Sequence, residues 1–594
     1  MMMRWSLDDL YTSFDSPEFL EDVRRVPEEI AEMEEYAAVN FMSPERAGEK
    51  IAHFLTLEME VNRRISKVMA FANLTLAVNA RHEEARAVYA RMAMTVSNLT
   101  GPEVRFQRYL GELGDLAPLL EEDPLLSEHS FYLHELQENA RYLLSDGEER
   151  LLAKLTTSGS KAWTNLQNLL SSTLLVEMEE EGKIVSRPLP AVRNLAHHED
   201  AKVRRNAHEV ELKAYRKIEE SSAAALNGIK GEVLTVSALR GFSSPLAETL
   251  FHARMEEEIL NSMLTAIREY LPAFRRYLRR KAEILGHKNG LPFADLFAPL
   301  GKSRLHFTYD EAMEYIVRQF STFSPALGEF ARHAHEKNWL DVEPRDGKRG
   351  GAFCSNLHAI GQSRIMANFD GSFSNLTTLA HELGHGYHGH NLKKETILNS
   401  SYPMPIAETA SIFCETIVVN AALSELEGEE ALTLLEQSIS DACQVIVDIY
   451  SRFLFESELF AVREDHPASV EELKAMMLKA QKEAYGEGLD PEHLHPYMWL
   501  NKTHYYFPNR NFYNFPYAFG LLFSKGLYAE YLKRGEAFVP AYDELLAMTG
   551  KNSIREVALT MGIDVTTPDF FRSSLELVAK DIEKFLALTD PQKA

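Results

Sequence analysis

Apolar residues recur every three or four positions along most of the chain, and this spacing predicts helices. The longest such stretches are residues 46–78 and 429–462. Two stretches depart from the pattern. In residues 174–192, β-branched residues flank an E-E-G-K turn, and residues 350–369 have glycines around short strand-like runs. The sequence therefore predicts a predominantly α fold with two small β elements.

Helical periodicity resumes near residue 200, and we place a domain boundary there. The chain has 594 residues, more than one compact core usually holds. It contains no repeat, Pro-rich linker or low-complexity tract that would separate independent modules. We therefore expect two closely joined lobes, an N-terminal helical lobe (1–200) and a catalytic lobe (201–594).

The amino-acid composition and net charge of the chain disfavour some classes of binding partner. Hydrophobic residues make up 45% and charged residues 25%, as in globular proteins. A formal net charge of −25 disfavours nucleic acid and anionic membrane surfaces. The first ten residues contain acids, and no run approaches about 18 uninterrupted apolar residues. These features predict a cytoplasmic protein, and nothing in the sequence indicates its oligomeric state.

The three cysteines, Cys354, Cys414 and Cys443, are widely separated and form no C-x-x-C pair. This arrangement supports neither a disulfide framework nor a cysteine zinc cluster. We expect buried free thiols.

Residues 379–390, LAHELGHGYHGH, concentrate side chains that bind metals. His381 and His385 are four residues apart, so on a helix their imidazoles point in nearly the same direction, about 40° apart. Glu382 lies about 100° further round, where its carboxylate is suited to contact a metal-bound water. The segment therefore predicts an H-E-x-x-H zinc helix.

A catalytic zinc usually takes three protein ligands, so another element must supply the third. Pro403 and Pro405 predict a helix start near Ile406, which puts Glu408 in its first turns. Taken alone, Glu408 is more typical of a solvated acid at a helix N-terminus than of a metal ligand. Its apolar neighbours favour burial, and a buried carboxylate needs a cation, so we predict that Glu408 is the third ligand. Glu415, seven residues on, is expected to accept a hydrogen bond from a ligand imidazole.

The other histidines lack such partners. His388 shares the face of His381, and we expect it to support or pack against the ligands without binding the metal. Seven more are expected on the surface or in loops: His197, His198, His333, His335, His390, His493 and His495.

The motif H-E-x-G-H-x-x-H, followed 25 to 30 residues later by a helical Glu, resembles the thimet-oligopeptidase family of zinc metallopeptidases, specifically its oligoendopeptidase F branch. WSLDDLY, DLFAPL, GKRGGAFCSN, IMANFDGSFSNLTTLAHELGH and HYYFPNRNFYNFPYAFG also resemble that branch in order and spacing. The resemblance covers nearly the whole chain. It implies a two-lobed, clam-like helical metallopeptidase, with one zinc per chain and short unstructured peptides as substrates.

The resemblance also implies roles in the aromatic segment that begins at His504. His504 and Tyr517 would stabilise the oxyanion, and Tyr513 would contact the substrate. Aromatic residues at this density also commonly pack a core, and without the resemblance that reading is the stronger one.

The strand-like run 363–369 precedes the motif helix directly. At a sheet edge such a strand would hold an extended peptide through its main chain, with Ala367 and Gly351 as substrate-binding positions. An internal strand is an equally good interpretation of the pattern.

Two features depart from the branch and concern substrate preference. Ala352, Phe353 and Cys354 replace a stretch that is often rich in hydroxyl groups. Gly386 and Gly389 are expected to loosen the end of the motif helix.

The predicted chemistry is peptide hydrolysis. Zinc lowers the pKa of its bound water towards about 7, Glu382 takes the proton, the hydroxide attacks the carbonyl, and Glu382 then protonates the leaving amine. A non-catalytic peptide-binding scaffold of the same fold is an alternative, but such a protein would be expected to lose Glu382 or a ligand, and none is missing.

A zinc carboxypeptidase of similar helical fold is a second alternative. It would need a cation for the substrate carboxylate, and four side chains could serve: Arg345, Lys348, Arg349 and Arg510.

Overall fold

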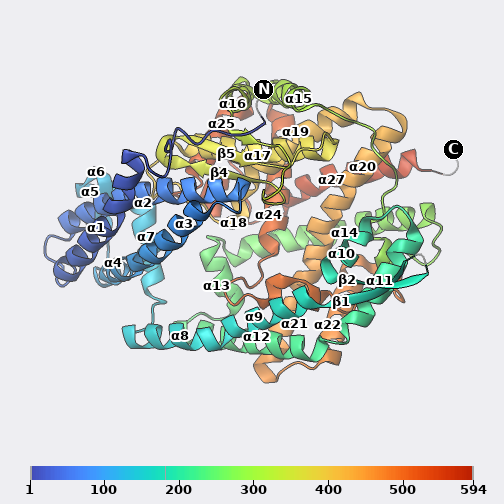
Figure 1. Ribbon diagram of the computed structural model, residues 1–594, viewed down its shortest axis with the longest axis horizontal. Helices are drawn as coiled ribbons and strands as arrows, with labels where there is room; N and C mark the ends of the chain where they lie inside the picture. Colours follow the sequence, from blue (N-terminus) through green and yellow to red (C-terminus); the bar gives the residue numbers. More distant parts are fainter. Residues whose placement is uncertain (1–2, 181, 591–594) are drawn as a thin grey trace. The chain divides into compact units, whose positions relative to one another are not determined.

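Helices form most of the structure, a computed structural model that describes residues 3–180 and 182–590 (Figure 1). The first long predicted helix is α2 (Ala47–Val78). The second is continuous but contains a π-helical turn (Gln444–Asp448) between α20 (Gly428–Cys443) and α21 (Ile449–Asp465). The predominantly α class is therefore confirmed.

Contacts divide the chain into two compact units, each assembled from three segments. The first comprises Met1–Leu143, Leu305–Ala421 and Glu530–Ile563. The second comprises Leu144–Arg304, Ala422–Ala529 and Asp564–Ala594. A division into folding domains at residue 200 stays a prediction, because contact-defined units are not folding domains. The motif helix nevertheless shares its unit with the N-terminal helices.

The N-terminal segment supplies half of the α-helices of the first unit. They are α1 (Pro17–Asn40), α2, α3 (Glu83–Val96), α4 (Thr100–Glu112), α5 (Ala117–Glu122), α6 (Pro124–Glu128) and α7 (Ser130–Ala140). The other two segments contribute α15 (Tyr309–Phe323), α16 (Pro325–Glu336), α17 (Phe373–Leu392), α18 (Met404–Ala407), α25 (Phe538–Met548), α26 (Ile554–Leu559) and most of α19 (Thr409–Glu425).

The second unit is also largely helical. Its helices from the first half of the chain are α8 (Asp146–Ser158), α9 (Ser160–Thr173), α10 (Leu189–Asn194), α11 (Ala201–Tyr215), α12 (Glu219–Arg240), α13 (Pro245–His252) and α14 (Glu257–Ile284). Later helices are α20, α21, α22 (Val470–Tyr485), α23 (Met498–Asn501), α27 (Pro568–Leu588) and most of α24 (Phe515–Arg534).

Aromatic rings fill the core of the N-terminal helices. Phe41 stacks on Tyr109 with ring centroids 4.7 Å apart, and Phe54 lies 4.5 Å from Phe106. These contacts join α2 and α4 to the end of α1, which gives the first unit a rigid base.

The predicted hairpin near residue 180 is present. β1 (Leu175–Glu180) pairs antiparallel with β2 (Lys183–Pro188). Val176 and Met178 are buried while their neighbours along β1 are exposed, the alternation expected of a sheet with one covered face. The predicted turn includes Glu181, which lies outside the described residues.

The second β element is a three-stranded sheet with the order β3–β5–β4. β4 (Phe353–Leu357) pairs antiparallel with β5 (Gln362–Met366), and β3 (Leu340–Asp341), which sequence analysis missed, pairs parallel with β5. β5 is therefore the central strand, so the edge-strand interpretation of residues 363–369 is wrong. The main chain of Ala367 is already occupied: its N–H donates to Asp341 O (2.9 Å) and its carbonyl accepts from Lys348 Nζ (2.6 Å).

One helical span, Met404–Glu425, is long and apolar enough to cross a membrane by length and composition alone. Glu408 and Glu415 lie within the span, and 56% of its apolar 18-residue window is buried inside the protein.

All three cysteines are free thiols. Cys414 and Cys443 are buried, as predicted, whereas Cys354 on β4 is partly exposed.

Glu58 on α2 makes the stability of the first unit depend on pH. The side chain is buried, accepts a hydrogen bond from Tyr132 Oη (2.7 Å), and its Oε2 has no partner among the described residues. Burial raises the pKa of Glu58 to about 8. The folded protein thus keeps this carboxyl protonated at pH values where the unfolded chain has released the proton.

We expect Glu58→Gln to raise the melting temperature at pH 8 and to have little effect near pH 4. Below the unfolded-state pKa both states are protonated, and above it wild-type stability falls by about 1.4 kcal/mol per pH unit until the folded pKa is reached. Thermal unfolding from pH 4 to pH 9 checks this. Glu60→Gln, an exposed change on the same helix, is the control, and a constant gap between Glu58→Gln and wild type would contradict the account.

Candidate metal centre

The motif helix α17 begins with an N-terminal cap. The Ser372 side chain accepts the Asn375 N–H (3.2 Å), and the Asn375 side chain in turn accepts the Asp370 N–H (2.6 Å). The helix then runs unbroken to Leu392. Capping fixes the helix start, and thereby the angular position of the motif residues that follow.

His381, His385 and Glu408 converge in the first unit. Glu408 Oε2 lies 3.3 Å from His381 Nε2 and 3.5 Å from His385 Nε2. The two imidazole rings are 5.0 Å apart and nearly perpendicular. These three residues form one of the two groups in the described chain that could hold a metal ion.

The chain geometry at Glu408 explains how an acid from a later element reaches the histidines. Pro403 precedes α18, Glu408 follows it with φ −89° and ψ 4°, and α19 starts at the next residue. The predicted helix start near residue 406 is thus two short helical pieces, with Glu408 at the junction. Ser411 Oγ donates to Glu408 Oε2 (2.7 Å) and helps to fix the carboxylate.

Each imidazole is oriented by a second contact. His381 Nδ1 lies 3.2 Å from Glu415 Oε2, the contact that helical spacing predicts. His385 makes a hydrogen bond with the backbone of Ala407. A partner on the far side of a ligand imidazole fixes its tautomer and its direction.

The charges of the cluster suit a cation. Burial lowers the pKa of His381, but hydrogen bonds to Glu408 and Glu415 outweigh burial and raise that pKa to about 10. Burial raises the pKa of Glu408, but the two histidines outweigh it and lower that pKa to about 2. Burial lowers the pKa of His385 to about 4. A cation that binds here therefore displaces a proton from His381.

Glu382 is buried, with 7% of its surface exposed. Burial raises the pKa of Glu382 to about 7, against the positive charge of His381 and a hydrogen bond from the backbone of Cys354. The carboxylate therefore faces strand β4. A carboxylate with a pKa near neutrality is suited to exchange a proton.

At three glycines of α17, atoms of neighbouring segments approach the helix backbone closely. An added Cβ would lie 2.5 Å from Ala410 O at Gly384, 2.9 Å from the Phe330 ring at Gly386, and 2.3 Å from the Asn356 side chain at Gly389. The expectation that Gly386 and Gly389 loosen the helix is therefore wrong. The two glycines instead allow neighbouring side chains to approach the helix backbone closely.

Asn356 on β4 was not anticipated from the sequence. Its Nδ2 donates to the carbonyl of His385 (3.1 Å), and its Oδ1 accepts from Ser363 Oγ (2.8 Å). The amide thus links β4 and β5 to the helix at a predicted ligand. Gly389, which leaves room for it, is the only sign of this contact in the sequence.

His388 packs away from the metal group. Its ring is fully buried, stacks on Tyr402 with centroids 4.1 Å apart, and contacts Thr549 Oγ1 through Nε2 (2.8 Å). Tyr387 Oη donates to Asp543 Oδ1 (2.7 Å). Both contacts attach α17 to the α25 region.

His504, Tyr513 and Tyr517 form a cluster in the second unit. The His504 ring stacks on Tyr513 at 5.3 Å, and Tyr513 meets Tyr517 edge-on at 5.8 Å. Burial, followed by the charges of Arg452, Lys502 and Arg510, lowers the pKa of His504. The imidazole is therefore neutral at pH 7 and keeps one N–H that can donate.

The four cations considered for binding a substrate carboxylate divide into two pairs. Arg345 and Lys348 bind Asp341, with closest contacts of 2.7 and 2.8 Å. Arg349 is exposed, and the Arg510 guanidinium lies 5.1 Å from the centre of the Tyr513 ring.

His495 lies in a loop, as expected, but it is not a surface histidine. The side chain is only 2% exposed and lies with His208 and Glu211 in the second unit. The H-x-x-E spacing of residues 208 and 211 on one helix was the available signal.

Known proteins resemble this chain over most of its length. The chain matches the model described as "Peptidase family M3" over residues 194–577 and the model described as "Oligopeptidase F" over residues 113–174. It is 22% identical to Oligopeptidase PepF of Bacillus subtilis over 593 residues, which cover 98% of this chain and 86% of that protein.

Two crystal structures share the fold. A Chlamydophila abortus protein superposes with a TM-score of 0.83 at 20% identity, covering 99% of this chain and 98% of that one. Oligoendopeptidase-F from Enterococcus faecium has a TM-score of 0.71 at 19% identity, covering 96% and 99%.

We expect Gly384→Ala to destabilise the protein and weaken metal binding, because the new methyl group would push the backbone of residues 410 and 411, and with it Glu408, away from the histidines. Overpacking of this kind costs about 1–3 kcal/mol. Melting temperature and zinc affinity check this. In the control Gly147→Ala, the added methyl group meets no described atom within 4 Å, and equal behaviour of the two variants would contradict the role of Gly384.

Proposed function

This chain belongs to peptidase family M3, and from that premise we propose that it is a zinc endopeptidase of the oligoendopeptidase F branch that hydrolyses internal bonds of short, unstructured peptides. The observation that carries the proposal is the convergence of His381, His385 and Glu408, with Glu382 next to the first histidine on the same helix.

The donor set fits zinc. Zinc prefers imidazole nitrogen and carboxylate oxygen at about 2.0–2.2 Å in tetrahedral geometry, which separates ligand atoms by roughly 3.3–3.5 Å. The Nε2–Oε2 distances of 3.3 and 3.5 Å match that separation. We propose one zinc per chain at this site, held by His381, His385 and Glu408, with Glu415 orienting His381.

When bound, the zinc supplies a Lewis acid that lowers the pKa of a coordinated water. Glu382 then receives the proton of the attacking water and returns it to the leaving amine. Its burial favours this exchange, because the protonated and ionised forms of Glu382 are close in energy near neutral pH.

We further propose that His504 and Tyr517 donate hydrogen bonds to the oxyanion and that Tyr513 contacts the substrate. The support is the resemblance of the segment, together with the neutral state of His504 among cationic neighbours. Each preorganised donor of this kind can contribute about 3 kcal/mol to the stabilisation of the transition state.

β3 and β4 are the two edge strands of the sheet, since β5 lies between them. We propose that β4 and the preceding Gly351, which is exposed and has a φ of 79°, hold an extended peptide through main-chain hydrogen bonds. This replaces Ala367 in the predicted substrate site. Main-chain hydrogen bonds depend little on the side chains of the substrate, which is consistent with broad specificity.

The alternative of carboxypeptidase action is less well supported. Arg345 and Lys348 are bound to Asp341, so two of the four cations considered are engaged. With a net charge of −25, nucleic acid and anionic lipid remain poor partners, and we propose that the enzyme acts on peptides in the cytoplasm.

We predict that Glu382→Gln keeps its zinc and its fold while turnover falls by several orders of magnitude, since an amide cannot accept the proton. Zinc content by mass spectrometry and hydrolysis of a quenched fluorescent peptide check this. His385→Ala is the matched control and should lose both zinc and activity. Near-normal turnover in Glu382→Gln would rule out the assignment of the base.

We also predict that cleavage per bond falls sharply between short peptides and a folded protein. An edge strand can pair only with an extended segment, and opening a stable fold costs on the order of 5 to 15 kcal/mol. Peptides of graded length and a compact disulfide-bonded domain, digested in parallel and followed by mass spectrometry, check this. The same compact domain after reduction and unfolding is the control. Equal rates for the folded and unfolded forms would contradict the substrate assignment.

A further inference from the structure

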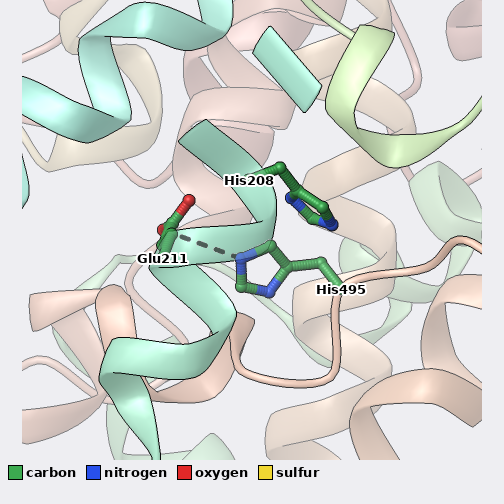
Figure 2. Close-up of side chains that lie close together, drawn as sticks. All are labelled: His208, Glu211 and His495. Carbon is green, nitrogen blue, oxygen red and sulfur yellow. Dashed lines mark ion pairs between the residues drawn. The ribbon is translucent and has the colours of Figure 1, made fainter. Parts of the chain in front are cut away.

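A second group of metal-binding side chains lies in the second unit (Figure 2). His208 and Glu211 come from α11, and His495 comes from the loop before α23. One ligand-type atom from each lies within 4.8 Å of the other two. Figure 2 shows His208 and Glu211 on the helix, with His495 next to them on the neighbouring loop.

The backbone around these residues is firmly held. His208 and Glu211 are three residues apart on the helix and therefore share a face. Gln481 fixes His495 through two hydrogen bonds, from its Nε2 to His495 O (2.8 Å) and from His495 N to its Oε1 (3.1 Å). Tyr215 Oη donates to Glu211 Oε1 (2.6 Å). These hydrogen bonds hold the backbone of the loop at His495 and orient the Glu211 carboxylate.

One buried nitrogen in the group is left without a hydrogen bond. His495 Nε2 points at Glu211 Oε1, but the distance of 3.7 Å exceeds hydrogen-bond length, and no other partner is found among the described residues. Buried polar atoms are nearly always satisfied, so an exception calls for an occupant or a role.

Space for an occupant adjoins the group. A cavity of about 250 Å³ is lined by the three side chains and also by Phe293, Lys502 and His197. This volume is large enough for an ion with a few waters.

Two of the residues have the protonation states that metal binding requires. Burial lowers the pKa of His208 to about 4, so its imidazole is neutral. Burial raises the pKa of Glu211, but His495, Tyr215 and Arg193 outweigh it and lower that pKa to about 2, so the carboxylate is ionised. Neutral imidazole and ionised carboxylate are the ligand forms.

Nearby cationic side chains oppose the binding of a metal ion and lower the affinity of the site for it. Arg193 Nε lies 3.6 Å from Glu211 Oε1, and Lys502 faces the same cavity. Arg204 is already paired with Asp295 at 2.8 Å. In addition, His495 Nδ1 accepts the Tyr497 N–H (3.2 Å), and this hydrogen bond must break if Nε2 is to bind a metal.

We propose that His208, Glu211 and His495 form a second site for a divalent transition-metal ion such as Zn²⁺, weaker than the site at His381, His385 and Glu408. The ligand atoms are further apart than in the first site, 3.7 Å against 3.3 and 3.5 Å between imidazole and carboxylate, so side chains must move inward on binding. A bound ion would join α11 to the loop that leads towards His504, a structural role outside the chemical step.

The test is zinc titration of the full-length protein, with bound metal measured after equilibrium dialysis at controlled free zinc. We expect two ions per wild-type chain, one tight and one weaker. His495→Gln and His208→Gln should each bind only the tight ion, and His385→Ala only the weaker one. His197→Gln, which lines the same cavity outside the group, is the control and should bind two.

Arg193→Gln sharpens the test. Removing the competing cation should lower the dissociation constant of the weaker ion several-fold and leave the tight ion unchanged. A wild-type stoichiometry of one, or two ions retained in both His495→Gln and His208→Gln, would overturn the proposal. Retention of the tight ion in these variants shows that they are folded, and His208→Gln decides the question if His495→Gln fails to fold.

Discussion

The close approach of α17 to the start of α19 is the constraint on which the centre depends. Only a residue without a side chain fits at Gly384, where a Cβ would lie 2.5 Å from a backbone oxygen. This approach places the junction residue Glu408 against His381 and His385. A partly buried carboxylate is costly unless a cation accompanies it, and the hydrogen bonds of His381 to Glu408 and Glu415 raise the pKa of that imidazole, which favours its protonated form. A divalent metal ion would compensate the carboxylate charge more strongly than a proton on His381 does.

The surroundings of α17 then keep the ligand atoms in place. Tyr387 and His388 attach the helix to the α25 region, and Asn356 attaches it to the sheet. Because Asn356 donates to the His385 carbonyl, the backbone of a predicted ligand is hydrogen-bonded to strand β4. A site held in this way loses little conformational freedom on binding metal or substrate, which is the advantage of preorganisation.

Sequence patterns predicted the features that depend on residues close together in the chain. Helical spacing was sufficient for His381, Glu382 and His385, and the prolines before Glu408 identified its helix start to within two residues. Non-local pairing was not predictable. β5 became central because β3 joins it, and two residues of β3 carry too little pattern to be recognised. His495 was misjudged because its partners lie far away in sequence, and the glycines of α17 were misread because their neighbours come from other segments.

The most direct test of the central claim is anomalous diffraction at the zinc absorption edge from crystals of the zinc-loaded protein. The account predicts that the strongest anomalous peak lies about 2.0–2.2 Å from His381 Nε2, His385 Nε2 and a carboxylate oxygen of Glu408, with Glu382 outside bonding distance. A zinc-loaded crystal with no peak at these three residues, or with Glu382 replacing Glu408 as a ligand, would contradict it.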